Sequence, residues 1–302
     1  MLTSRIRSGF VALVWLLVAA LAPPTAAVAG DATPLARAHA HNDFEHERPL
    51  FDALDHGFTS VEADIWLVDG ELLVAHDLPE VQPDRTLESL YLAPLRRIVT
   101  ENHGSVYPGY EHYFTLLIDI KTEAVSTYRV LHQQLRRYQV MLTTFGPRSV
   151  KEGAVTAIVS GNRPREVMES QRIRYAAYDG RMSDLGTGVS ATFMPLISDN
   201  WTTQFTWMGE GDMPEDERRR LRAIVATAHA NGQRVRFWAT PDAPGAAREN
   251  VWHELLAAEV DFINTDHLAD LQTFLLTNDP NPSEPYVKWT DTIGRSRMRK
   301  AS

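Results

Sequence analysis

The sequence contains no cysteine among its 302 residues. A disulfide framework and a thiol nucleophile are therefore both excluded. A protein of this composition has to be held together by its hydrophobic core, or by its core together with a metal ion.

Positive charge is also scarce. The chain has 30 Lys and Arg residues against 39 Asp and Glu residues, which gives a formal net charge of −9. Surfaces that bind nucleic acid are usually basic. The acidic balance therefore argues against nucleic acid as a partner.

The only long apolar run lies at the N-terminus, over residues 10–21. Two arginines precede it and an Ala-Val-Ala motif follows at 27–29, the pattern of a secretory signal peptide. An uncleaved anchor is the alternative, but Pro23 and Pro24 interrupt the run where a spanning helix would have to continue. We predict that residues 1–29 are a signal peptide cleaved after Ala29 and that the protein is secreted.

The remaining chain alternates between segments typical of strands and of helices. Eight strands are predicted at 36–41, 58–66, 113–120, 155–160, 173–178, 192–197, 235–240 and 260–264. Helices are predicted at 48–57, 86–100, 123–138, 214–231, 246–257 and 267–276. This alternation predicts one α/β domain over residues 30–277, a (β/α)8 TIM barrel.

One stretch and one alternative fold qualify that prediction. The segment 179–191 is rich in Gly and Ser and need not contain a full helix. An open doubly wound sheet is the alternative fold, but no glycine fingerprint follows the first predicted strand to mark a nucleotide site.

Two features lie outside the regular alternation. Asp69-Gly70 separates two apolar runs and predicts a β-hairpin directly after the second strand. Residues 278–302 are rich in Pro and Asn and end in basic residues, so we predict a flexible C-terminal tail. A membrane tether is the less favoured alternative for this tail, because a few basic residues without a lipid or aromatic anchor bind weakly.

Carboxylates gather in the first third of the chain. Glu62 and Asp64 alternate with Val61, Ala63 and Ile65, so both acids lie on one face of the second strand. A solvated face would tolerate the pair, and so would a divalent cation between the two carboxylates. We favour the cation because a His-Asp pair, His76-Asp77, follows one hairpin later.

The third predicted strand ends in Asp119-Ile120-Lys121, which could supply a third carboxylate or could be an ordinary solvated strand end. His41 ends the first strand and His76 follows the hairpin, so both approach the same rim of a parallel barrel. His39 is undecided between a supporting and a catalytic position. Isolated histidines are usually packed or surface residues, and on that ground we set aside His46, His56, His103, His112, His132, His229, His253 and His267.

The combined pattern His41, Glu62-x-Asp64, His76-Asp77 and Asp119-x-Lys121 resembles the superfamily of glycerophosphodiester phosphodiesterases and phosphatidylinositol-phospholipase-C-like barrels. The amino-acid sequences of segments 39–43, 60–66, 236–242 and 263–266 are most similar to one branch of this superfamily, the altered-inheritance-of-mitochondria proteins and their secreted bacterial homologues. The resemblance extends over essentially the whole mature chain.

The resemblance implies that Glu62, Asp64 and Asp119 hold one divalent cation, Mg²⁺ or Ca²⁺. It also implies that His41 and His76 are the catalytic histidines and that Lys121 faces the substrate phosphate. The chain departs from the glycerophosphodiesterase signature at its first histidine, where His-Arg-Gly is replaced by His41-Asn42-Asp43. The arginine contact to phosphate is thus missing, and glycerophosphodiester specificity is not implied.

The sequence therefore predicts a secreted, metal-dependent phosphoric diester hydrolase that acts on a phospholipid or a glycerophosphodiester-type substrate. Imidazoles titrate in the range needed to take a proton or attack and to protonate a leaving alkoxide, and we assign these roles to His41 and His76 respectively. A secreted glycoside hydrolase and a non-catalytic binding protein of the same fold are the alternatives. At most peripheral membrane contact is expected.

Overall fold

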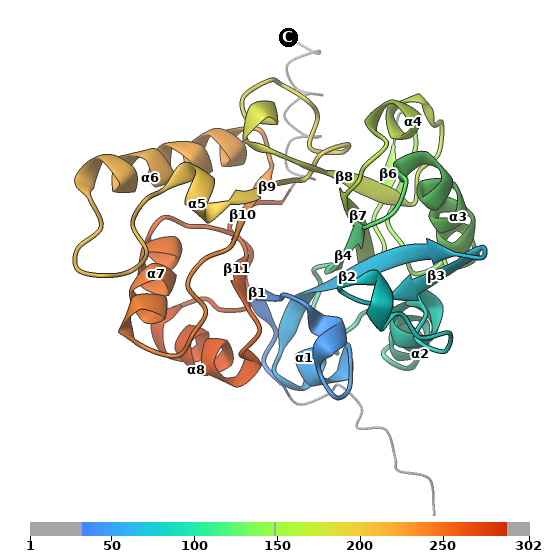
Figure 1. Ribbon diagram of the computed structural model, residues 1–302, viewed down its shortest axis with the longest axis horizontal. Coiled ribbons are helices and arrows are strands. Elements are labelled where there is room, and N and C mark those ends of the chain that lie inside the picture. Colours follow the sequence, from blue (N-terminus) through green and yellow to red (C-terminus); the bar gives the residue numbers. More distant parts are fainter. Residues whose placement is uncertain (1–31, 148, 289–302) are drawn as a thin grey trace, which may run out of the picture.

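The computed structural model of the chain describes residues 32–147 and 149–288. Figure 1 shows the strands gathered at the centre with the helices around them. Eight parallel strands form the central sheet: β1 Leu35–Ala40, β2 Phe58–Val68, β4 Phe114–Ile120, β7 Val155–Gly161, β8 Ala176–Gly180, β9 Leu196–Asn200, β10 Arg234–Trp238 and β11 Ile263–Thr265.

The sheet curls until its two ends meet. The strands pair in the order β10-β9-β8-β7-β4-β2-β1-β11. A parallel bridge between Arg236 and Phe262 brings β11 beside β10, with the Phe262 amide donating to the Val235 carbonyl at 3.1 Å. The predicted (β/α)8 barrel is confirmed, nearly closed at this last seam.

An α-helix follows each strand of the barrel except β8, with the β3 hairpin strand preceding the helix after β2. The helices are α1 Phe51–Asp55, α2 Ala93–Glu101, α3 Ala124–Arg137, α4 Arg165–Ser170, α5 Trp201–Gln204, α6 Glu215–Ala230, α7 Ala246–Ala257 and α8 Leu268–Asn278. A π-helical turn, Glu88–Leu92, leads into α2, and the segment 179–191 contains only the 3-10 turn Met182–Asp184. The short α4 and α5, and a small hairpin of β5 Thr144–Phe145 with β6 Val150–Lys151, were not predicted.

Several elements begin later in the chain than their patterns suggested, and a local reason is clear for three of them. Helix α1 starts after Leu50 because that residue has a φ of 66°, which a right-handed helix does not accept. Strand β8 starts at Ala176, since Ile173 is half exposed and belongs to the preceding turn. Strand β9 starts only after Pro195, which has no amide hydrogen for a ladder.

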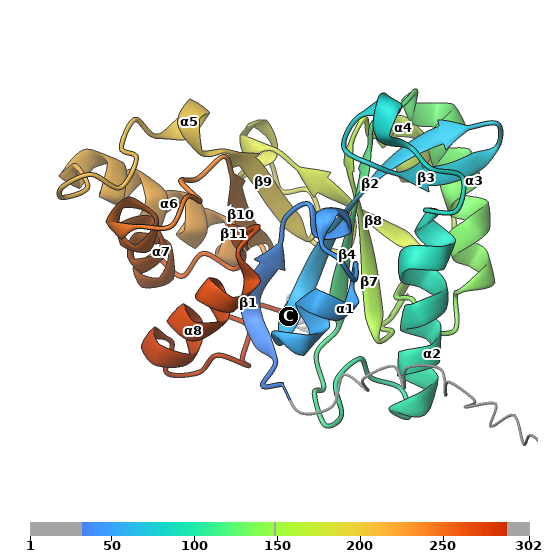
Figure 2. The same ribbon diagram turned by 60° about the horizontal axis from the view of Figure 1, so that its bottom comes forward.

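The predicted hairpin is confirmed. Strand β2 runs on from the barrel and pairs in antiparallel fashion with β3, Glu71–Val74. Asp69 and Gly70 both have positive φ, 50° and 89°, as a two-residue type I′ turn requires. Figures 1 and 2 both show the hairpin at the outer edge of the barrel, beside α3.

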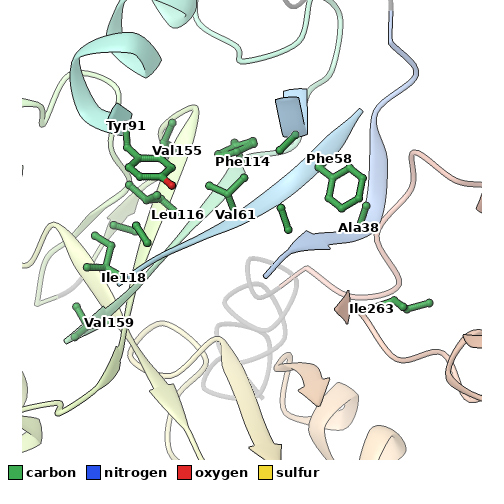
Figure 3. Packing of buried hydrophobic residues seen from close by; sticks show 14 of the residues in the cluster. Ala38, Phe58, Val61, Tyr91, Phe114, Leu116, Ile118, Val155, Val159 and Ile263 are labelled. Carbon is green, nitrogen blue, oxygen red and sulfur yellow. The ribbon is translucent and has the colours of Figure 1, made fainter. Parts of the chain in front are cut away.

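The barrel has apolar residues on both faces of its strands. The larger cluster fills the space between strands and helices, and Figure 3 shows Val61, Leu116 and Val155 there together with Tyr91. A smaller cluster that includes Leu117, Ile158 and Phe262 occupies the opposite face. Asp119 follows Leu117 by two residues and so shares its face. The interior of the barrel therefore combines a small apolar cluster with carboxylates at its C-terminal mouth.

The prediction of a flexible tail from residue 278 onwards starts the tail too early in the chain. The segment that follows α8 is packed against β1 as far as the structure describes it, whereas residues 289–302 lie outside the described residues. The Pro282 carbonyl accepts from the Ala36 amide at 2.7 Å, and Arg37 both pairs with Asp279 at 2.9 Å and lies over the Tyr286 ring. The loop-like composition was interpreted correctly as non-helical, but β1 has backbone and side-chain groups that bind it.

This packing allows a test of stability. The Arg37 and Asp279 side chains are only 3% and 2% exposed, so Asp279→Asn would leave a buried guanidinium without its counter-charge. We expect the free energy of unfolding to fall by about 3–5 kcal/mol, measured by denaturant titration. Glu215→Gln, which removes the exposed partner of Arg218, is the control and should cost less than about 1 kcal/mol. Equal losses in the two variants would contradict the docking of the segment.

Within the described ranges, no helix combines the length and the apolar character needed to cross a bilayer.

Candidate active site

Three carboxylates converge at the mouth of the barrel. Strands β2 and β4 pair so that Asp64 lies directly opposite Asp119, and Glu62 shares the face of Asp64. One oxygen from each of Glu62, Asp64 and Asp119 lies within 4.8 Å of the other two. The structure thus brings together the three acids that the sequence analysis placed in one cluster.

Lys121 lies against this cluster. Its Nζ is 3.0 Å from Asp64 Oδ2 and 3.2 Å from Asp119 Oδ1. Burial and the neighbouring Glu62 carboxylate raise the pKa of Asp64 to about 7, although Lys121 opposes the shift. Burial also raises the pKa of Asp119, again against Lys121. A single ammonium therefore does not offset the crowding of the acids.

Glu62 has a different environment. Arg236 on β10 reaches across the barrel and donates to Glu62 Oε2 at 2.6 Å, while its Nε donates to Asn264 at 2.7 Å. Burial opposes ionisation of Glu62, but the Arg236 guanidinium and His39 outweigh it and hold the pKa of Glu62 below its usual range. Glu62 is thus fixed as a carboxylate with a set orientation.

His39 is a supporting residue of this carboxylate. It is buried, with Nε2 at 3.4 Å from Glu62 Oε2 and Nδ1 at 2.7 Å from the Ser60 hydroxyl. Burial and Arg236 lower the pKa of His39 to about 4, so the ring is neutral near pH 7. His39 is therefore buried beneath the site, whereas the side chain of His41 is partly exposed at the mouth of the barrel.

His41 follows β1 and is held by a residue that follows the neighbouring strand, β11. Its Nδ1 lies 2.8 Å from Asp266 Oδ1, just beyond β11. Asp242 in turn accepts from the Asp266 amide at 2.7 Å and from the Thr265 hydroxyl at 2.7 Å. Because a carboxylate only accepts hydrogen bonds, neutral His41 carries its proton on Nδ1. Its Nε2 has no hydrogen-bond partner among the described residues and can accept a proton.

His76 stands somewhat apart from the acids. Its side chain is 50% exposed and its Nδ1 is 3.2 Å from Asp77 Oδ2. The chain passes close to the cluster at the preceding residue, where the Ala75 amide donates to the Asp64 carbonyl at 3.3 Å. Among the described residues, no hydrogen bond or ion pair joins the His76 side chain to the three carboxylates. The hairpin therefore brings His76 to the same rim, but on its outer side.

The sequence analysis did not assign roles to Arg236, Asp242, Asn264 and Asp266. The signal for Arg236 was present, since a charged residue between Val235 and Phe237 in a buried strand requires a partner inside the barrel. No pattern indicated which acid that partner would be.

The donor set fits a hard divalent cation. All three acids offer carboxylate oxygens, which Mg²⁺ and Ca²⁺ prefer. Asp64 Oδ1 is buried and has no hydrogen-bond partner within the described part of the chain. An orphaned acceptor of this kind is costly unless something else binds it.

The position of Asp119 depends on a glycine. Gly161 at the end of β7 has a φ of 65°, and a Cβ there would lie 2.2 Å from Asp119 Oδ1 and 2.5 Å from the Ile120 carbonyl oxygen. We expect Gly161→Ala to displace the Asp119 carboxylate and lower kcat/KM at least about tenfold. Gly188→Ala is the control, because Gly188 also has a positive φ but nothing lies within 4 Å of its Cβ position. Similar activity of the two variants would show that Asp119 does not need this space.

The comparison with known families now decides the class of the protein. The family model of the AIM6-like phosphodiesterase domain matches residues 26–179, more than half of the chain. The chain belongs to this family. A model of the glycerophosphoryl diester phosphodiesterase family also matches residues 234–269, which include Arg236 and Asp266. The predicted superfamily and branch are confirmed, and the AIM6-like chain is of phosphodiesterase type.

Similar proteins come from fungi. Altered inheritance of mitochondria protein 6 of Eremothecium gossypii is 28% identical over 282 residues, covering 81% of this chain and 70% of the relative. The protein of the same name from Lachancea thermotolerans is 28% identical over 276 residues, covering 78% of this chain and 64% of the relative. A homologue from Arthroderma benhamiae is 27% identical over 255 residues, covering 76% and 80%. The AIM6-like chain therefore spans between just under two thirds and four fifths of the length of these relatives.

Among solved structures, the AIM6-like chain is similar to the phosphatidylinositol-specific phospholipase C from Listeria monocytogenes. The TM-score is 0.46 at 8% sequence identity, with 86% of this chain and 97% of the other covered.

Proposed function

We propose that the protein is a secreted, divalent-cation-dependent phosphodiesterase that hydrolyses a phospholipid or a glycerophosphodiester-type substrate. The observation that supports this proposal is the placement of Glu62, Asp64 and Asp119 beside Lys121 at the mouth of the barrel. Carboxylates in glycosidases flank the scissile bond from two sides, whereas these three acids gather at one point. A phosphodiesterase is favoured over a glycoside hydrolase on that geometry.

In this proposal the three carboxylates would hold the cation, which when bound would neutralise the phosphate oxygens of the substrate. The Lys121 ammonium is a second positive charge beside these oxygens, and it stabilises the negative charge that develops on them in the transition state. Arg236 and His39 keep the Glu62 carboxylate ionised and in place. The cation is Mg²⁺ or Ca²⁺, because all the donors are hard oxygens.

Two histidines move the protons. His41 Nε2 takes a proton from the attacking water as the new P–O bond forms. His76 gives a proton to the alcohol oxygen as the old P–O bond breaks. The products are a phosphomonoester and a free alcohol, and the two histidines exchange their protons with solvent.

The hydrogen bond between Asp266 and His41 predicts a pH effect. Burial lowers the pKa of His41, but the hydrogen bond to Asp266 outweighs burial and the pKa is raised overall. When neutral His41 is the base, kcat/KM rises as the pH increases through the pKa of His41, because the ring loses its extra proton. This rise is the acidic limb of the pH profile. We expect Asp266→Asn to shift that acidic limb to lower pH and to reduce kcat at least about 100-fold through loss of orientation. A loss of activity without a shift of the limb would leave Asp266 with a purely structural role.

The proposed function is tested with a panel of phosphodiesters followed by phosphorus NMR. We expect a phosphomonoester to appear with at least one glycerophosphodiester or phospholipid, to be abolished by EDTA and to return with Mg²⁺ or Ca²⁺. Turnover that persists in EDTA would refute cation dependence. The absence of turnover with every diester would favour a binding protein of the same fold.

Secretion is part of the same proposal. The signal peptide expected over residues 1–29 lies outside the described residues. N-terminal sequencing of protein recovered from the medium is expected to begin at Gly30. An intact N-terminus on protein retained in the cells would contradict it.

A further inference from the structure

A guanidinium lies on the interior side of the barrel mouth, outside the group of residues assigned so far. Ser160 follows Ile158 by two residues and Asp179 follows Ala177 by two, so both share the face of the small interior apolar cluster. Arg181 follows β8. Its Nη1 donates to Asp179 Oδ2 at 2.6 Å and its Nη2 donates to the Ser160 hydroxyl at 3.3 Å. These contacts fix the Arg181 guanidinium inside the mouth.

The guanidinium is close to the candidate cation site. Ser160 pairs in register with Asp119 of β4, and neighbouring strands lie about 4.8 Å apart. Lys121 Nζ is 3.2 Å from the same Asp119. Lys121 and Arg181 therefore contact side chains that are neighbours on the interior face. The Arg181 side chain is 25% exposed and that of Asp179 is fully buried, so the guanidinium is the member of this pair that a ligand meets.

An indole ring supports the guanidinium from the other side. Trp238 follows Arg236 by two residues on β10 and so shares its interior face. The Arg181 Cζ lies 4.9 Å from the centre of the Trp238 ring. The next residue, Ala239, has a φ of 57°, and residues held in such uncommon conformations cluster at ligand and active sites. The ring face that Arg181 covers is not available to the ammonium of a ligand.

Arg181 still has donors to offer. Its bonds to Asp179, to Ser160 and to the Gly180 carbonyl use three of its five N–H groups. The Nε hydrogen and one Nη2 hydrogen have no acceptor in the described part of the chain. The Asp179 carboxylate, in contrast, also accepts from the Ser160 and Ser198 hydroxyls at 2.7 and 2.6 Å. A ligand therefore meets free N–H donors here and no free carboxylate.

This group lies across the mouth from His76. In the strand order of the barrel, β9 is the fourth strand from β2 in either direction, and β8 and β10 flank β9. Figure 1 shows the hairpin of β2 and β3, which precedes His76, on the far side of the barrel from β9 and β10. In the proposed function the leaving alcohol departs at His76. The alcohol that stays on phosphorus is then directed across the mouth, towards Arg181 and Trp238.

We propose that Arg181 is a specificity-determining residue that binds the alcohol retained on phosphorus and selects an uncharged, hydroxyl-bearing alcohol over one that carries an ammonium. The free N–H groups of Arg181 donate to hydroxyls of the first kind of alcohol. An ammonium meets a like charge and finds the Trp238 ring covered. This inference rests on the proposed function and narrows its substrate class.

The test uses three p-nitrophenyl diesters that differ only in the retained alcohol. The alcohols are glycerol, choline and 3,3-dimethylbutanol, which is the uncharged carbon analogue of choline. We expect kcat/KM for the glyceryl diester to exceed that for the dimethylbutyl diester by about 10- to 100-fold, the range for a hydrogen bond to a charged group. The dimethylbutyl diester should exceed the choline diester at least about threefold, because only choline brings a like charge. Equal values for the three diesters, or a preference for choline, would overturn the proposal.

A charge-matched double variant, Asp179→Asn with Arg181→Met, removes the guanidinium without leaving a buried carboxylate unpaired. Both preferences should fall to near unity in this variant, and preferences that persist would contradict the role of Arg181. Arg181→Lys keeps the charge but not the fork of donors, so it should still discriminate against choline and lose most of the preference for glycerol. Arg218→Met is the control, because Arg218 pairs with Glu254 at 2.7 Å between α6 and α7, and it should leave both preferences intact.

A binding measurement separates this inference from the proposed function. If none of the three diesters is hydrolysed, the proposed function fails for these substrates. Calorimetric titration of phosphocholine and of 3,3-dimethylbutyl phosphate, which keep the retained alcohol and its phosphate, still tests Arg181. At least about threefold tighter binding of the uncharged compound to the wild type, with loss of that difference in the double variant, would support the proposal. Equal, reversed or undetectable binding to the wild type, or the same difference in both proteins, would refute it.

Discussion

His76→Ala is expected to slow cleavage of a diester with a poor leaving group, such as glycerol or choline, by about 10²–10⁴-fold. The same variant should cleave a p-nitrophenyl phosphodiester almost as fast as the wild type, because p-nitrophenolate departs without a proton. The His76 side chain is half exposed and, among the described residues, is hydrogen-bonded to Asp77 alone, which suits a group that meets the departing alcohol. Steady-state rates on the two substrates measure the contrast.

His41→Ala provides the matched comparison. Attack on phosphorus is needed whichever group departs, so this variant should lose about 10²–10⁴-fold on both substrates. Equal losses on both substrates in His76→Ala would contradict its role as the acid. Rescue of His41→Ala by the activated leaving group would mean that the two roles are reversed.

Asp119→Asn is expected to abolish cation binding and turnover together while the fold persists. An amide keeps the shape of the side chain but removes the charge that a hard cation requires. We expect the affinity for Mg²⁺ or Ca²⁺ to fall at least about 100-fold, because changes even in groups that only support metal ligands cost 10- to 100-fold. Calorimetry measures the affinity, and circular dichroism checks the fold.

Two further variants sharpen this result. Glu62→Gln should lose the cation and also stability, since it leaves the buried Arg236 without its carboxylate partner. Glu71→Gln, an exposed acid on the hairpin, is the control and should change neither property. Unchanged cation binding in both Asp119→Asn and Glu62→Gln would place the cation site elsewhere.

Local patterns were sufficient where neighbouring residues determine the structure. The alternation of Glu62 and Asp64 with apolar residues sets their common face, because successive strand side chains point in opposite directions. Asp69-Gly70 sets the hairpin through its positive φ angles. The alternation of strands and helices predicted the barrel, and parallel pairing then brings Asp119 to Asp64.

Contacts between distant parts of the chain were not predictable in this way. Arg236 and Glu62 are 174 residues apart, and His41 and Asp266 are 225 apart, so both pairs depend on closure of the barrel. The same holds for the segment after α8, whose composition resembles a tail but whose Asp279 is held by Arg37 of β1.

By itself, the sequence determined most of the element types, the acidic strand face and the motifs that mark a phosphodiesterase family, because these depend on residue order and on strand and turn geometry. Only the tertiary structure decided which charges are paired. It assigned Arg236 to Glu62 and Asp266 to His41, because pairing depends on which side chains the closed barrel brings within hydrogen-bond distance.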